Sequence, residues 1–245
     1  MNTNNYIVNI CKQAKIASQE ISCASEKVKN NILKSLIKNI NSSRDIIISS
    51  NATDIKNLKS LKNFVESFVD RLLIDNERID SMIASLEEII VIKDPVGEIK
   101  NLETMPSGIK VGKMAMPLGV IAMIYESRPN VTVDASALSI KSGNSIILRG
   151  GSESINTNLV LAECIQNSIS ENNLDKNIVQ LIDNTDRVIV NELLLQNDYI
   201  DIVIPRGGKN LISLIDEISS IPVLRHLDGI CHVYIDKDAD IKKAI

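Results

Sequence analysis

The chain has 245 residues and a mass of 27.0 kDa, with 44% hydrophobic and 24% charged residues, which excludes disordered, collagen-like and low-complexity architectures. Its 27 Lys plus Arg and 31 Asp plus Glu give a formal charge of -4, and it has no Trp, so neither nucleic-acid nor base-stacking surfaces are expected. No run approaches ~18 consecutive apolar residues, and the four cysteines form no close pairs, so we expect a cytoplasmic protein without a membrane span.

The first 94 residues contain neither glycine nor proline and are predicted to be mostly helical. Apolar residues recur at helical spacing over residues 7–21, over 28–40 after a break at 22–25, and over 79–90. Proline and glycine in the segment Asp94-Pro95-Val96-Gly97 end the last of these helices. We therefore expect residues 1–95 to form an N-terminal helical segment.

Residues 96–117 are predicted to form a β-hairpin, because a turn at Met105-Pro106-Ser107-Gly108 separates two short extended stretches. From residue 118 to 245 strand-length apolar runs alternate with helical patterns. The runs lie at 120–125, 145–148, 178–182, 201–204 and 231–235, and the helical patterns at 131–141, 156–170, 187–195 and 209–218. This alternation predicts an α/β fold with a doubly wound, Rossmann-type parallel sheet that is covered by helices on both faces.

A basic glycine turn, Arg149-Gly150-Gly151-Ser152-Glu153, directly follows the predicted strand at 145–148. Ligands of doubly wound sheets bind outside the carboxyl ends of the strands, where an arginine and backbone amides can hold a phosphate. The alternative is a plain glycine turn with a solvated arginine, since the segment is not a GxGxxG fingerprint.

A second turn of the same character, Arg206-Gly207-Gly208-Lys209, lies between the strand at 201–204 and the helix at 209–218. Amides at the start of that helix can face an anion. The segment is not a Walker A loop, because Val203 stands at the first glycine position and Asn210 where a magnesium-binding Ser or Thr is needed. Two such turns in one sheet favour a shared nucleotide crevice.

Polar residues also crowd the loop Glu126-Ser127-Arg128-Pro129-Asn130, which follows the predicted strand at 120–125. Asn130 could donate to a developing oxyanion, and Arg128 could clamp a carboxylate or a phosphate. The alternative is that Asn130 caps a helix beginning at Val131.

Four residues near the end of the chain carry metal-ligand chemistry: His226, Asp228, Cys231 and His232. Their spacing is not that of a zinc site, so no metal is expected. Cys231 is predicted to be a buried strand residue rather than a nucleophile.

Taken together, residues 117–135, 141–153, 203–209 and 225–234 resemble the gamma-glutamyl phosphate reductases, a branch of the aldehyde dehydrogenase superfamily. The segments Glu-Ser-Arg-Pro-Asn-Val and Leu-Arg-Gly-Gly-Ser-Glu are typical of this branch. The resemblance implies an aldehyde-dehydrogenase-like fold and NADPH-dependent reduction of L-glutamyl 5-phosphate to the semialdehyde, with release of phosphate, in proline biosynthesis. In that family a cysteine thiolate attacks the acyl phosphate, and hydride from NADPH then reduces the thioester.

The same resemblance assigns roles to individual residues. Arg149 would bind the 2'-phosphate of NADPH, and the other cofactor-binding positions are Gly150, Gly151, Ser152, Glu153, Arg206, Gly207, Gly208 and Lys209. The spacing of the family's oxyanion asparagine, counted forward from Pro117, falls on Arg128. Counted back from Gly143, it falls on Asn130. The chemistry favours Asn130 as the oxyanion donor and leaves Arg128, with Ser127, for substrate binding.

The nucleophile of the family lies in an Arg-Pro-Gly-Val-Cys-Asn type segment shortly after the stretch that corresponds to residues 233–245. None of the four cysteines matches that segment, so we expect the catalytic domain to be missing from this chain and the chain alone to be inactive. The resemblance further implies a homo-oligomer built through the hairpin, and the upstream glutamate kinase as a partner. The alternatives are a non-catalytic dinucleotide-binding module and an enzyme that oxidises a different small aldehyde, the latter disfavoured by residues 126–129.

Overall fold

The computed structural model describes residues 3–60, 65–126, 128–186, 188–225, 232 and 234–244. Its N-terminal part consists of helices, as predicted: α1 (Thr3–Ser22), α2 (Glu26–Ser42), α3 (Arg44–Lys59), α4 (Glu66–Leu72) and α5 (Asn76–Val91). The break between α1 and α2 is set by Ser25, whose side chain accepts a hydrogen bond from the amide of Val28. Asp75 caps α5 in the same way.

Four parallel strands form the central sheet in the order β5-β4-β3-β6. The strands are β3 (Val120–Tyr125), β4 (Ser145–Arg149), β5 (Val179–Leu181) and β6 (Ile202–Arg206). Their connections contain α6 (Asn130–Lys141), the short 3-10 turn η1 (Ser152–Ser154), α7 (Ile155–Ser170), η2 (Lys176–Ile178) and α8 (Val188–Leu194), and α9 (Lys209–Ile218) follows β6. The chain therefore runs outward from β3 through β4 to β5 and returns to the other side of β3.

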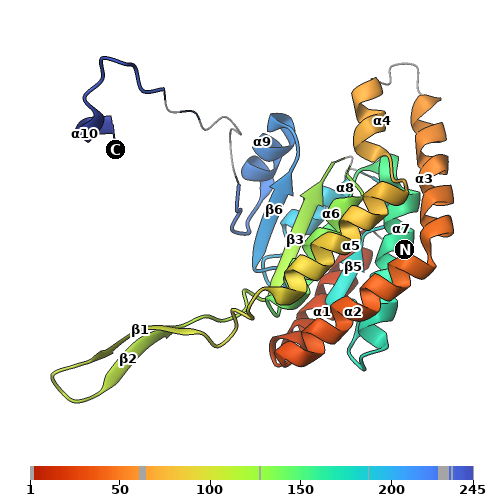
Figure 1. Cartoon of the computed structure of the whole chain (residues 1–245). Coiled ribbons are helices and arrows are strands. Elements are labelled where there is room, and N and C mark those ends of the chain that lie inside the picture. The colour runs from red at the N-terminus through yellow and green to blue at the C-terminus, as the bar shows by residue number, and fades with distance from the viewer. Residues whose placement is uncertain are drawn as a thin grey trace.

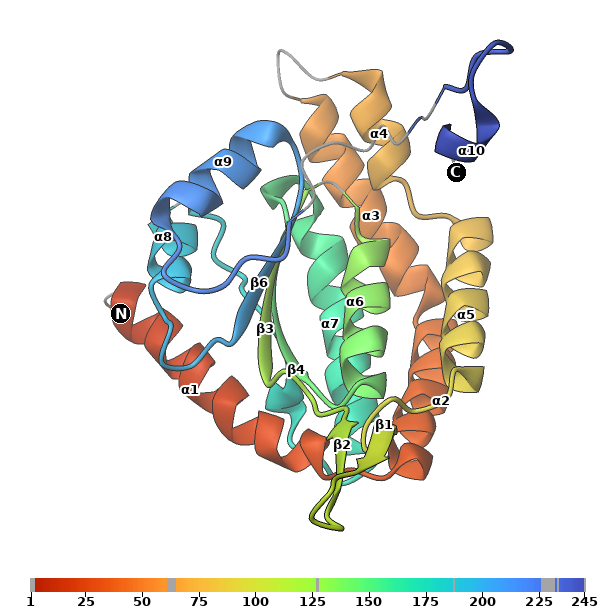
Figure 2. The ribbon, with the colours of Figure 1, turned by 90° about the vertical axis from the view of Figure 1, so that its left-hand side faces the viewer.

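Helices cover both faces of the sheet, which confirms the doubly wound α/β fold (Figure 2). On one face Ile121, Met123 and Tyr125 of β3 pack in a core that includes residues of α2, α5, α6 and α7. On the other face Val120, Ala122 and Ile124 pack with residues of α1, α8 and α9. Every residue of β3 is buried, because alternate side chains of a central parallel strand enter opposite cores.

The predicted hairpin is present as β1 (Ile99–Thr104) and β2 (Lys110–Met114), which pair antiparallel and project from the body of the molecule (Figure 1). Its turn is closed by Gly108, whose amide donates to the carbonyl of Met105 at 2.8 Å and whose φ of +84° suits glycine. All residues of both strands are exposed, including Leu102 and Val111.

The described residues of the stretch 231–235 form no strand, in contrast to the prediction. His232, Tyr234 and Ile235 lie outside any strand and Tyr234 is 85% exposed, while the remaining two positions lie outside the described residues. A strand needs a hydrogen-bonded neighbour, and at the free edge of β6 the bonds of Val203 are made to Pro222 and Leu224 instead. The last described element is the short helix α10 (Ile241–Ala244). Within the described ranges, no helix combines the length and apolar character needed to cross a bilayer.

Candidate functional site

The three polar loops singled out in the sequence emerge from neighbouring strands at one edge of the sheet. In the register of the sheet Ile124 lies opposite Arg149 and Tyr125 lies opposite Arg206. The backbone amide of Glu126 donates to the carbonyl of Arg206 at 3.1 Å, which joins the loops after β3 and β6. The chain leaves β3 through α6 on one face and enters β6 from α8 on the other, so this edge is a topological switch point of the sheet.

The turn after β4 is held in a defined conformation by Arg149. Its guanidinium donates to the carbonyl of Gly150 at 2.6 Å and to the carbonyl of Thr185, beyond the end of β5, at 2.9 Å. Gly150 is required by packing, because a Cβ there would lie 2.3 Å from the Nδ2 atom of Asn158. Arg149 thus ties two strand ends together and fixes the shape of the turn.

The start of α7, which follows this turn, is capped by a carboxylate from α3. Asp54 is 2% exposed, and its Oδ1 atom accepts from the backbone amide of Asn156 at 3.2 Å and from its side-chain amide at 2.7 Å. Its Oδ2 atom accepts from the backbone amide and the hydroxyl of Thr157 at 2.8 and 2.6 Å. These α7 amides are therefore already bound within the protein.

The turn after β6 leads into α9 and is more open. Gly208 is the N-cap of α9, and a Cβ added there would meet nothing within 4 Å. Its amide donates to the Oε2 atom of Glu126 at 3.1 Å, and a Cβ at Gly207 would lie 2.7 Å from the Cδ atom of that glutamate. Unlike the buried Asp54, Glu126 is exposed, so its carboxylate can move aside for an anionic ligand at the start of α9.

Asn130 does not cap a following helix, and that alternative is wrong. Helix α6 begins at Asn130 itself with Pro129 as N-cap, and no side chain caps it. The Nδ2 atom of Asn130 instead donates to the Oδ2 atom of Asp134, one turn later, at 3.1 Å. The reason is that Pro129 already has helical φ and ψ, so the helix begins one residue earlier than the sequence pattern indicated.

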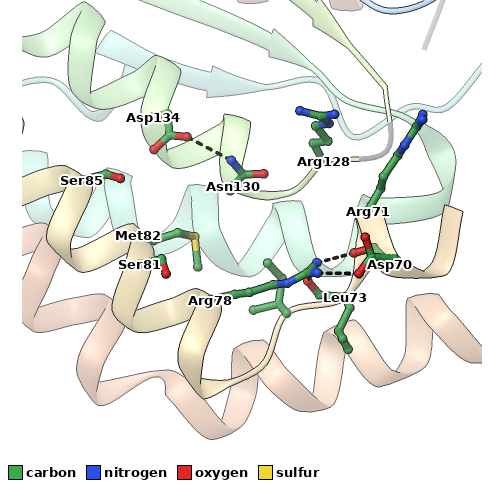
Figure 3. Close-up of a pocket in the computed structure, with 11 residues that line it drawn as sticks. Asp70, Arg71, Leu73, Arg78, Ser81, Met82, Ser85, Arg128, Asn130 and Asp134 are labelled. Carbon is green, nitrogen blue, oxygen red and sulfur yellow. Dashed lines mark hydrogen bonds and ion pairs between the residues drawn. The ribbon is translucent and has the colours of Figure 1, made fainter. Parts of the chain in front are cut away.

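Asn130, Arg128 and Asp134 line a pocket of about 320 Å³ together with residues of the α4–α5 region (Figure 3). Ser127, also predicted to bind substrate, lies outside the described residues. Asp54 and the α4–α5 side of this pocket were missed in the sequence, because no local pattern connects them with the loops after the strands.

No described cysteine is placed to act in this site. Cys11 and Cys164 are buried. Burial raises the pKa of the Cys11 thiol to about 12, and it also raises the pKa of the Cys164 thiol above its ordinary value. Cys23 is exposed, but it lies at the amino edge of the sheet, opposite the edge of the site. It lines a pocket together with Val96, and Val96 lies near Gly143, just before β4. Cys231 lies outside the described residues.

Most of the four residues with metal-ligand chemistry near the end of the chain lie outside the described residues. His226, Asp228 and Cys231 are not described, and His232 is exposed. Among the residues that are described, no group of three His, Cys, Asp or Glu side chains is arranged to hold a metal ion.

Comparisons with known proteins place this arrangement in context. A family model described as the aldehyde dehydrogenase family matches residues 2–245. A gamma-glutamyl phosphate reductase of Ruthia magnifica subsp. Calyptogena magnifica is 48% identical over 241 residues, which are 98% of this chain and 57% of that protein.

Two crystal structures of gamma-glutamyl phosphate reductases have the same fold. The Thermotoga maritima structure matches with a TM-score of 0.91 at 37% identity, over 97% of this chain and 57% of that one. The Saccharomyces cerevisiae structure matches with a TM-score of 0.82 at 34% identity, over 96% and 60%. The chain therefore spans less than two thirds of the length of these relatives.

Proposed function

Because the chain belongs to the aldehyde dehydrogenase family, we propose that it forms the cofactor-binding part of an NADPH-dependent enzyme. The reaction is the reduction of L-glutamyl 5-phosphate to L-glutamate 5-semialdehyde with release of phosphate, a step of proline biosynthesis in the cytoplasm. The observation that carries the proposal is the meeting of two basic glycine turns with the loop after β3 at one switch point of the sheet. The similarity to named gamma-glutamyl phosphate reductases supports the choice of substrate.

The residues at the sheet edge fit a dinucleotide. The turn from Arg149 to Glu153 would hold the adenosine ribose, with the Arg149 guanidinium on its 2'-phosphate. The turn from Arg206 to Lys209 would face the pyrophosphate and nicotinamide side, where the open space at Gly208 lets a ligand approach the start of α9. When bound, NADPH supplies the hydride for the reduction.

The loop after β3 would handle the substrate. The side-chain amide of Asn130 donates to the oxyanion that develops on the acyl carbon, a role that lowers the barrier by electrostatic stabilisation. Arg128 and Ser127 bind the anionic end of the substrate. We infer that the nucleophilic cysteine is none of the four in this chain, in agreement with the buried, high-pKa thiols of Cys11 and Cys164.

The remaining parts of the proposal concern organisation. Residues 1–95 and 118–245 form the cofactor-binding domain, and residues 96–117 form a hairpin of the oligomerisation type. The exposed apolar side chains of that hairpin, such as Ile99, Val111 and Met114, support a homo-oligomer of the complete enzyme. Glutamate kinase, the enzyme that makes the acyl phosphate, is the proposed upstream partner.

The cofactor assignment is tested by calorimetric titration with NADPH and, separately, with NADH. The folded chain is expected to prefer NADPH, and Arg149→Ala is expected to lower that preference by roughly tenfold to a hundredfold, because a charge-assisted contact with phosphate is lost. Lys176→Ala, which removes an exposed cation at the amino edge of the sheet, serves as the matched control and should change nothing. Equal loss of NADPH and NADH affinity in Arg149→Ala would instead mean that Arg149 only holds the turn together.

A further inference from the structure

A pocket lies between the start of α6 and the region that joins α4 to α5. Two of its arginines and the aspartate Asp134 lie at opposite ends. Its volume is about 320 Å³, and Leu73, Ile74 and Met82 supply its apolar lining. Figure 3 shows Arg71 and Arg128 extending in the same direction from α4 and from the loop before α6, whereas Asp134 lies on α6 beyond Asn130. The pocket thus has a cationic end, an amide in the middle and an acidic end.

A third arginine, Arg78, belongs to the wall of this pocket and serves the fold. Its guanidinium donates to the carbonyl of Leu73 at 2.8 Å and to the Oδ1 atom of Asp70 at 2.8 Å, and it also bonds the Asp70 carbonyl. These bonds fix the turn between α4 and α5. The charge of Arg78 is paired with that of Asp70, so ligand binding is left to Arg71 and Arg128.

Neither Arg71 nor Arg128 makes an ion pair within the part of the chain that the structure describes. Both are exposed, and the Arg71 guanidinium lies over the ring of Phe68, 5.7 Å from its centroid. Two guanidinium groups that line one pocket and pair with no carboxylate among the described residues favour a doubly charged anion such as a phosphate.

Asp134 forms the acidic end of the pocket. It is half-buried, and its carboxylate accepts a hydrogen bond from Asn130, while no cation pairs with it among the described residues. Burial raises the pKa of Asp134, and the Asn130 hydrogen bond lowers it by less. A partly desolvated carboxylate of this kind gains from an ammonium group that enters the pocket.

The spacing along α6 matches the substrate of the proposed function, on which this inference rests. Asn130 and Asp134 are one turn apart on the same helix face, and the Nδ2 atom of Asn130 lies 3.1 Å from the Oδ2 atom of Asp134. A ligand oxygen bound to Asn130 and a ligand nitrogen bound to Asp134, each about 3 Å from its partner, can therefore lie roughly 5 Å apart. In an extended L-glutamyl group roughly 5 Å separate the acyl carbon from the α-nitrogen, given covalent bonds of ~1.5 Å. We propose that Asp134 receives the α-ammonium group of L-glutamyl 5-phosphate, while Arg71 joins Arg128 on its phosphate.

The assignment is tested by isotope-edited NMR titration of the 245-residue chain with a stable analogue in which CH2 replaces the bridging oxygen of L-glutamyl 5-phosphate. The second probe is the same analogue without its α-amino group. The chain is expected to bind the amino analogue on the order of tenfold more tightly, because an ammonium–carboxylate contact is gained. Asp134→Asn is expected to abolish this preference, whereas Glu88→Gln, an equal charge change at an exposed position of α5, preserves it.

A second variant separates the two ends of the pocket. Arg71→Gln is expected to weaken both analogues by about the same factor, roughly tenfold, and to keep the preference for the amino compound. Circular dichroism and the dispersion of the amide NMR signals report whether each variant is folded. Equal binding of the two analogues by the unmodified chain, or a preference that survives Asp134→Asn, overturns the assignment of Asp134.

The same titrations distinguish this inference from the proposed function. A chain that binds NADPH but neither analogue overturns the pocket assignment and leaves the cofactor crevice standing. A chain that discriminates between the analogues through Asp134 but binds no NADPH supports the pocket and contradicts the cofactor crevice.

Discussion

Asn130→Ala is expected to lower kcat by about 10²–10³-fold, the usual effect of removing one oxyanion donor. The variant is made in a chimera that joins residues 1–245 to the portion of the Ruthia magnifica relative that the match leaves uncovered. The chimera is expected to reduce NADP with L-glutamate 5-semialdehyde in a phosphate-dependent manner, the reverse of the proposed reaction. Residues 1–245 alone should show no rate above background.

The expected loss of kcat follows from the position of Asn130. It is the first residue of α6, directly after the loop that follows β3, and it lines the pocket. Its bond to Asp134 orients the amide. KM should change far less than kcat, because the donor acts on charge that develops in the transition state. Asn197→Ala, an exposed asparagine elsewhere, is the matched control. A kcat of Asn130→Ala within a few-fold of the unmodified chimera would contradict the assignment.

Asp54→Ala is expected to lower the free energy of unfolding by about 3–5 kcal/mol, because it leaves several buried donors at the start of α7 without an acceptor. Asp54 accepts four hydrogen bonds from Asn156 and Thr157, which lie more than 100 residues away. Its loss would also loosen the Arg149 turn, which immediately precedes α7. NADPH affinity should therefore fall together with stability.

Urea denaturation of the two variants Asp54→Ala and Asp45→Ala provides the comparison. Asp45 lies on the same helix but is exposed, and its removal should cost less than about 1 kcal/mol. Equal destabilisation by the two substitutions would show that the cap on α7 does not contribute as described.

Much of the sheet and several helices could be predicted from the sequence because their signals are local. Strand β3 and helix α9 have the predicted bounds, since β3 is a continuous apolar run and α9 begins directly after a pair of glycines. The same locality explains why the turns at 149–153 and 206–209 were expected to share one crevice: they follow parallel strands, and such strands end on the same side. The loop at 126–130 lies at that edge for the same reason.

The rest depends on contacts that no window of sequence reveals. In the sequence Asp54 is one of several polar residues of its helix, and only the packing of α3 against α7 makes it a cap. Arg71 joins the pocket of Arg128 only because α5 and α6 pack together. The apolar run at 231–235 predicts a strand, but its described residues form none, because a strand also needs a hydrogen-bonded partner.

The central claim, that a dinucleotide binds at the carboxyl edge of β3, β4 and β6, is tested most directly by mapping NADPH on the isotopically labelled chain. Backbone amide shifts are followed by NMR during titration. The account predicts that the largest changes occur in the turns from Arg149 to Glu153 and from Arg206 to Lys209, with little change in the hairpin or at Cys23. Changes confined to other surfaces of the folded chain, or no changes at saturating NADPH, would contradict it.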